Sequence, residues 1–131
     1  MAEPIVFISR FRLAPGRSGD VEAAFADAVD LIESSKPRTI VFAAYVDDGR
    51  SELRIMHVFA DAEAMERHFA GSAQRSAAIA GLVEPAGFEV YGAAPDAPLD
   101  QLRDEASAAG VELAVFARPI GGFVRSAHAR P

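Results

Sequence analysis

The sequence contains no cysteine and no tryptophan, and lysine occurs once, at Lys36. Without cysteine the chain has no disulfide bond, no thiolate metal site and no cysteine nucleophile. No apolar run approaches the roughly 18–20 residues that span a bilayer. The first residues alternate like a strand and lack the basic and apolar regions of a signal peptide. We therefore expect a cytoplasmic protein with no membrane partner.

Basic side chains are also scarce, because 13 Lys and Arg residues stand against 19 Asp and Glu residues, for a formal net charge of −6. This acidic balance argues against a nucleic-acid partner. Hydrophobic residues make up 50% of the chain, which indicates a folded protein. The length of 131 residues fits one domain, so residues 1–131 are expected to form a single domain. The excess of arginine over lysine, together with abundant alanine, favours a bacterial source.

Hydrophobic periodicity predicts an alternation of strands and helices. Ser18 and Asp61 are the expected N-caps of the first two helices, and Gly110 ends the last one. The expected strands are residues 4–14, 38–47, 50–60, 86–93 and 111–118, and the expected helices are 19–35, the segment after Asp61, 73–83 and 97–109.

The first 93 residues thus follow the order β-α-β-β-α-β, which is the ferredoxin-like arrangement of the α+β class. Residues 94–131 add an α-β extension and a tail, and no low-complexity linker separates them from residues 4–93. We expect this extension to pack on the same body. A sheet with apolar residues on both faces needs cover on its second face, which predicts a homodimer.

The turn between the second and third strands is expected to be a two-residue hairpin at Asp48-Gly49, because both positions of such a turn need positive φ. This places His57 on an apolar side of the sheet. The register gives the pairs Asp47–Arg50, Ala44–Leu53, Phe42–Ile55 and Ile40–His57.

The segment YVDDGRSELRIMHVFADAEAMERHFAGS carries a polar hairpin and a strand that runs into a D-A-E-A helix ending at His68, and a Pro15-Gly16 turn follows the first strand. With these features, residues 4–93 resemble the antibiotic-biosynthesis monooxygenase family. The resemblance implies a dimeric α+β barrel with a small-molecule pocket between each sheet and its own helices. Some members are cofactor-independent oxygenases of aromatic polyketides, some degrade haem, and many have no assigned activity.

The resemblance also bears on individual residues. His68 matches the helix histidine of the family. His57 and Phe59 stand where members often carry a glutamate and a tryptophan. No histidine lies between residues 69 and 127, which argues against haem degradation. No cofactor is expected.

His57 and His68 are the candidate catalytic residues, because a neutral imidazole can take a proton from an acidic phenol or C–H group. The alternative is that both are core histidines bonded to backbone carbonyls or to each other. The expected lining of the ligand pocket is Phe42, Ile55, Phe59, Met65 and Phe69. Three hypotheses stay open: a cofactor-independent monooxygenase of a small aromatic or polyketide-like substrate, a non-catalytic small-molecule-binding dimer, and a scaffold whose core is full.

Other polar residues carry weaker signals. Tyr45 and Arg54 lie on the opposite side from His57, which favours the surface between two subunits, whereas Tyr91 and Arg118 are ambiguous. No metal is expected, because His57, His68 and His128 lack metal-ligand spacing. In the tail, Phe123 is expected to dock on a partner subunit. The basic end of the chain is expected to dock on the acidic first helix of either subunit through Arg118, Arg125 and Arg130.

Overall fold

The computed structural model describes residues 4–125. It confirms the predicted order of strands and helices. The elements are β1 (Ile5–Leu13), α1 (Ser18–Ser35), β2 (Thr39–Val46), β3 (Glu52–Phe59), α2 (Ala62–Phe69), α3 (Ser72–Ile79), β4 (Val83–Tyr91), α4 (Asp96–Ala109) and β5 (Leu113–Phe116).

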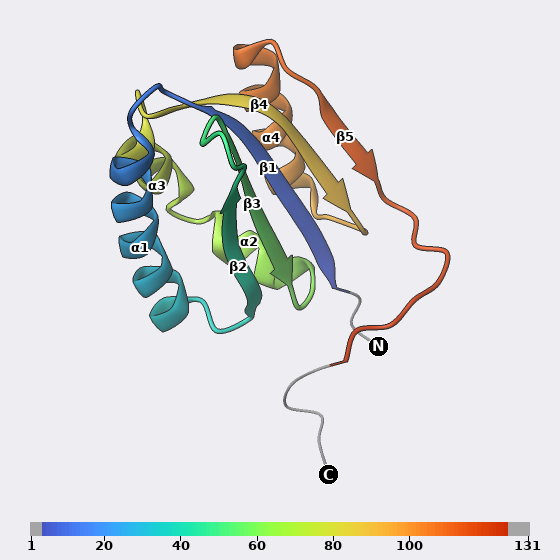
Figure 1. Cartoon of the computed structure of the whole chain (residues 1–131). Coiled ribbons are helices and arrows are strands. Elements are labelled where there is room, and N and C mark those ends of the chain that lie inside the picture. The colour runs from blue at the N-terminus through green and yellow to red at the C-terminus, as the bar shows by residue number, and fades with distance from the viewer. Residues whose placement is uncertain (1–3, 126–131) are drawn as a thin grey trace.

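The strands form one five-stranded sheet in the order β2-β3-β1-β4-β5, in which β5 runs parallel to β4 and the other pairs are antiparallel. Helices α2 and α4 lie behind the sheet in Figure 1, and α1 lies beside β2. The fold is therefore the ferredoxin-like α+β arrangement that the sequence predicts. The extension completes the sheet, because β5 pairs with β4.

The turn between β2 and β3 differs from the expected two-residue hairpin. Asp47 pairs with Glu52 across a four-residue loop, and its carboxylate accepts hydrogen bonds from the backbone N–H of Ser51 and of Glu52, each at 2.8 Å. Arg50, rather than Gly49, takes the left-handed conformation, with φ of 54°. The longer loop shifts the register by two residues, so that Phe42 pairs with His57.

The start of β2 also departs from strict alternation. The register shifts between Thr39 and Val41, which leaves Ile40 53% exposed. Thr39 instead points to the helix side, where its hydroxyl contacts His68. A strand irregularity of this kind reverses the side to which the preceding residues point. The expected place of Ile40 on the apolar side was therefore wrong.

The helix ends follow local hydrogen bonding. Asp61 caps α2 as predicted, since its side chain accepts a hydrogen bond from the N–H of Ala64 at 2.9 Å. Gly110 ends α4 in the left-handed conformation, also as predicted. Ser18 is the first residue of α1 rather than its N-cap, a position that Arg17 holds.

Apolar side chains between the sheet and the helices form two clusters. In the larger one, Leu99 and Leu102 of α4 pack with residues of the sheet and of α2, and Leu102 is 1% exposed. The smaller one lies between α1 and the hairpin end of the sheet. The helix of the extension is thus part of the main core.

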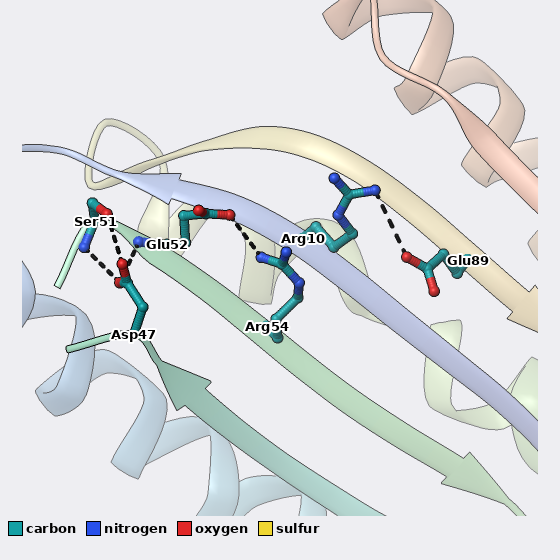
Figure 2. A network of polar contacts seen from close by, with 6 residues as sticks. All are labelled: Arg10, Asp47, Ser51, Glu52, Arg54 and Glu89. Atoms are coloured by element: carbon teal, nitrogen blue, oxygen red, sulfur yellow. Dashed lines mark hydrogen bonds and ion pairs between the residues drawn. The ribbon is translucent and has the colours of Figure 1, made fainter. Parts of the chain in front are cut away.

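The other face of the sheet carries no helix among the residues that the structure describes. Part of it is polar: Arg10 pairs with Glu89 at 3.7 Å and Arg54 with Glu52 at 3.1 Å (Figure 2). The Arg10 guanidinium passes over Gly87, where a Cβ would lie 3.1 Å from its Nη1. The half-buried or exposed apolar side chains of this face include Val6, Ile8, Val41, Ala43, Tyr45, Met56, Val58 and Tyr91. We refer to this side of the sheet as the open face.

After β5 the chain continues to residue 125 without regular structure. Ile120 is 99% exposed and Phe123 is 79% exposed, and the Arg125 guanidinium lies 5.0 Å from the centre of the Phe123 ring. The expected docking of Phe123 on a partner stays a prediction. His128 and Arg130 lie outside the described residues. Within residues 4–125 no helix is long and apolar enough to cross a membrane.

Candidate functional site

His57 and His68 are buried next to each other between the sheet and the helices. His57 lies on β3 and is 6% exposed, and His68 lies in the last turn of α2 and is 4% exposed. The two rings meet edge to face, with centroids 5.1 Å apart. The shifted hairpin register keeps both rings on the helix side of the sheet, because a shift of two residues preserves the side.

Each histidine is oriented by a hydrogen bond at Nδ1. Nδ1 of His57 donates to the backbone carbonyl of Phe7 at 3.0 Å, and Nδ1 of His68 lies 3.1 Å from the hydroxyl oxygen of Thr39. Since a carbonyl only accepts, the Nδ1 of His57 carries the proton. The Nε2 of neutral His57 therefore holds a lone pair that can accept one.

Aromatic rings surround the pair. Phe7 stacks on His57 with centroids 4.6 Å apart, and Phe42 lies 5.3 Å from His57 and 5.6 Å from His68. Phe25 of α1 stacks in turn on Phe42 at 4.8 Å. These contacts hold the imidazoles in an apolar wall.

Burial in this wall lowers the pKa of both imidazoles. The pKa of His57 falls to about 4, chiefly because the charged ring would lose its water, with a smaller contribution from the positive charge of Arg75. The pKa of His68 falls to about 2, again chiefly through burial, and then through the charges of His57, Arg75 and Lys36. Both rings are neutral at physiological pH.

A cavity of about 900 Å³ opens beside the histidines, between the sheet and helices α1, α3 and α4. His57 and His68 both contribute to its wall. Of the residues predicted to line the pocket, Phe42, Ile55 and Phe69 do so. The wall is mostly apolar and aromatic, as is common for sites that bind small organic molecules.

Phe59 and Met65 do not line this cavity. Both have 0% exposure and lie in the core behind the wall, where Phe59 contacts the ring of His68 at 5.0 Å. Phe59 belongs to β3 and Met65 to α2, and both side chains are buried where these two elements pack together. This packing corrects their expected contact with a ligand. They support the histidine wall from behind.

Several polar residues of the cavity were not predicted from the sequence: Ser9, Ser72, Arg75, Gln101 and Glu105. Gln101 and Glu105 come from α4, and Gln101 donates a hydrogen bond to Ser72 at 2.8 Å, which ties α4 to α3. Burial raises the pKa of Glu105. One sequence signal was available for Arg75, which is the single charged residue between Phe69 and Val83.

The remaining predicted residues lie away from the cavity. Tyr45 and Arg54 are on the open face, as is Tyr91, whose hydroxyl donates to Glu89 at 2.7 Å and whose ring stacks on Phe116. Arg118 is exposed beyond β5. In the described part of the chain, no group of three or more His, Asp or Glu side chains is placed to hold a metal ion.

Comparisons with known proteins agree with this architecture. The chain resembles MupZ from Pseudomonas fluorescens with a TM-score of 0.67 and 17% identity, over 98% of this chain and 99% of that one. It resembles SnoaB, a cofactor-independent oxygenase from Streptomyces nogalater, with a TM-score of 0.60 and 20% identity, over 74% of this chain and 99% of that one. For Rv0793 from Mycobacterium tuberculosis the TM-score is 0.57 and the identity is 18%, over 72% of this chain and 99% of that one.

These likenesses show the fold, and the similarity to MupZ extends it to the α-β extension. No curated protein matches the chain significantly. A family model, antibiotic biosynthesis monooxygenase, matches residues 4–79, which is more than half of the chain. The chain therefore belongs to the antibiotic biosynthesis monooxygenase family.

Proposed function

We propose that this protein is a cofactor-independent monooxygenase that takes a small aromatic or polyketide-like substrate into the cavity beside His57 and His68. The observation that carries the proposal is the cavity itself. Its volume of about 900 Å³ and its aromatic wall suit a flat polycyclic molecule. The family includes cofactor-independent oxygenases, of which SnoaB shares the fold.

The chemistry that we propose needs no bound cofactor, because the substrate supplies the electrons. His57 removes a proton from an activated CH₂ group through Nε2, which leaves a carbanion. The carbanion then forms a C–O bond with O₂. Cleavage of the O–O bond leaves a carbonyl on the substrate, and the second oxygen atom leaves as water with both hydrogens of the CH₂ group. His68 holds the wall beside His57 and orients the substrate.

We also propose that the protein acts as a homodimer through the open face. Tyr45 is 60% exposed there and Met56 is 36% exposed, although a sheet with helices on one side normally has its second face covered. The Nε of Arg10 is buried and has no hydrogen-bond partner within residues 4–125. A second copy of this face supplies both apolar cover and polar partners.

The test of the proposed activity is oxygen uptake by the purified chain, with a panel of anthrones, quinols and catechols and without added metal or flavin. We expect uptake by the wild type and a loss of about 10²-fold or more in His57→Ala, which removes the proton acceptor. His68→Ala is measured beside it, and circular dichroism shows whether each variant is folded. No uptake across the panel contradicts the proposal.

One observation favours a second function, a small-molecule-binding dimer without chemistry. The pKa of His57 at about 4 makes its neutral ring a weak base, and its Nδ1 is already bonded to Phe7. In that case the same aromatic ligands bind without consuming oxygen. Calorimetric titration of the panel, run beside the uptake measurement, separates the two functions.

A further inference from the structure

Arg75 is held in the cavity wall by the end of the neighbouring helix. Gly71, with φ of 81°, turns the chain from α2 into α3, and Arg75 follows in the first turn of α3. Its guanidinium reaches back and donates hydrogen bonds to the carbonyl oxygens of His68 and of Ala70, the latter at 3.4 Å. Carbonyls at a helix C-terminus carry partial negative charge, which favours a cation there. The guanidinium is thereby fixed beside the histidine pair.

The positive charge of Arg75 is not balanced by an ion pair. In residues 4–125 no carboxylate lies within ion-pair distance of its guanidinium. The other ionisable residues that line the cavity are Asp27 of α1, His57 of β3, His68 of α2 and Glu105 of α4. Burial favours the neutral form of Glu105 and of both histidines. The half-buried cation therefore faces a cavity in which both histidines are neutral.

We propose that Arg75 binds the oxyanion of the ligand, so that the cavity takes up a phenol as its anion. The inference deepens the proposed function and relies on it for the class of ligand. A guanidinium has five N–H donors, and two carbonyl contacts leave donors for a ligand oxygen. An anion close to a half-buried cation is stabilised more strongly than in water.

The proposed step is a simple ionisation. The O–H bond of the ligand breaks, its electron pair stays on oxygen, and the proton passes to the solvent buffer. No oxidant or reductant takes part. Burial is the main cause of the lowered pKa of both histidines, and the charge of Arg75 lowers them further. The same charge favours a ligand anion at that place. Neutral histidines and an anionic ligand are therefore compatible in one site.

The probe for the test is 4-nitrophenol, whose anion absorbs visible light. This probe has no activated CH₂ group, so the proposed oxygenation cannot consume it. We expect the full-length wild type to bind the phenolate at least about tenfold more tightly than the phenol, which lowers the apparent pKa of the bound probe by about one unit or more. Arg75→Gln loses this preference. Arg75→Lys retains part of it, because the charge remains.

Arg67→Gln is the matched control, since Arg67 is exposed on α2 and pairs with Glu63 at 2.8 Å. It should bind the probe as the wild type does. Equal affinity of the wild type for phenol and phenolate overturns the inference, as does an anion preference that survives in folded Arg75→Gln. Failure of the wild type to bind either form also contradicts it, because the probe is smaller than the cavity. If Arg75→Gln does not fold, the wild type and Arg75→Lys decide.

The outcomes are distinguishable from those of the proposed activity. Anion preference without oxygen uptake by any substrate supports the role of Arg75 and removes the oxygenase. Oxygen uptake by a wild type that binds phenol and phenolate equally supports the oxygenase and removes the role of Arg75.

Discussion

The ring of His57 meets the ring of His68 edge to face at 5.1 Å, so that two titratable groups share one buried wall. Protonation of either ring would place a charge in an aromatic environment and next to its neighbour. The pair is therefore stable only while both rings are neutral, and this makes the stability of the fold depend on pH.

We expect the free energy of unfolding to fall between pH 6.5 and pH 4. The pKa of His57 is lowered to about 4 and that of His68 to about 2. Below pH 6.5 the unfolded chain binds protons that the folded chain does not, so stability is present above that pH and is lost as the pH drops. Linkage gives a loss of roughly 2 kcal/mol for each histidine between pH 7.5 and pH 5.

Urea unfolding at pH 7.5 and at pH 5 measures this loss of stability. His57→Gln and His68→Gln remove one titrating group each, and each variant should lose less stability on acidification than the wild type. An equal loss in the wild type and in both variants would show that other groups cause the pH dependence.

Thr39→Val should destabilise the protein by about 1–3 kcal/mol, because it leaves Nδ1 of His68 buried without its partner. The distance of 3.1 Å between Nδ1 and the Thr39 hydroxyl is the relevant contact. Thr39→Ser keeps the hydroxyl and serves as the control. Equal unfolding midpoints for the valine and serine variants would contradict this role of the contact.

Much of the fold follows from sequence patterns, because they act locally. Alternation and helical periodicity gave the order of elements, and Asp61 and Gly110 marked helix ends through their own hydrogen bonding and backbone conformation. The hairpin register failed for a local reason of a different kind. The carboxylate of Asp47 accepts two backbone N–H groups of a four-residue loop, and this outweighs the preference of Asp-Gly for a tight turn.

The cavity was less predictable than the histidines. His57 and His68 could be identified because strand alternation and the face of a helix place them on the apolar side. Arg75 and Glu105 depend on how α3 and α4 pack, which periodicity does not determine. The same packing explains why Phe59 and Met65 do not line the cavity. Their side chains are of a kind that often lines pockets, but both are fully buried in the core behind the cavity wall.

Leu102→Ala should cost about 2–5 kcal/mol of unfolding free energy, because the residue is 1% exposed in the main core. The result tests whether α4 of the extension is required for the stability of the sheet it covers. Leu31→Ala is the control, since Leu31 is 52% exposed on α1 and should change stability little. A midpoint for Leu102→Ala close to that of the wild type would mean that α4 contributes little to the core.

Met56→Arg should convert the proposed homodimer into a monomer. Met56 lies on β3 in the open face, beside Ile8 of β1, and is 36% exposed, so a monomer accepts the charged side chain, whereas a covered interface does not. Arg54, two residues earlier on the same strand, lies on the same face, where it pairs with Glu52. Sedimentation velocity measures the change, with Leu31→Arg on the helix side as the control.

If the wild type sediments as a monomer, the open face is not a dimer interface, and the orphaned Nε of Arg10 needs another partner. If Met56→Arg stays dimeric while Leu31→Arg does not, the subunits meet through the helices instead.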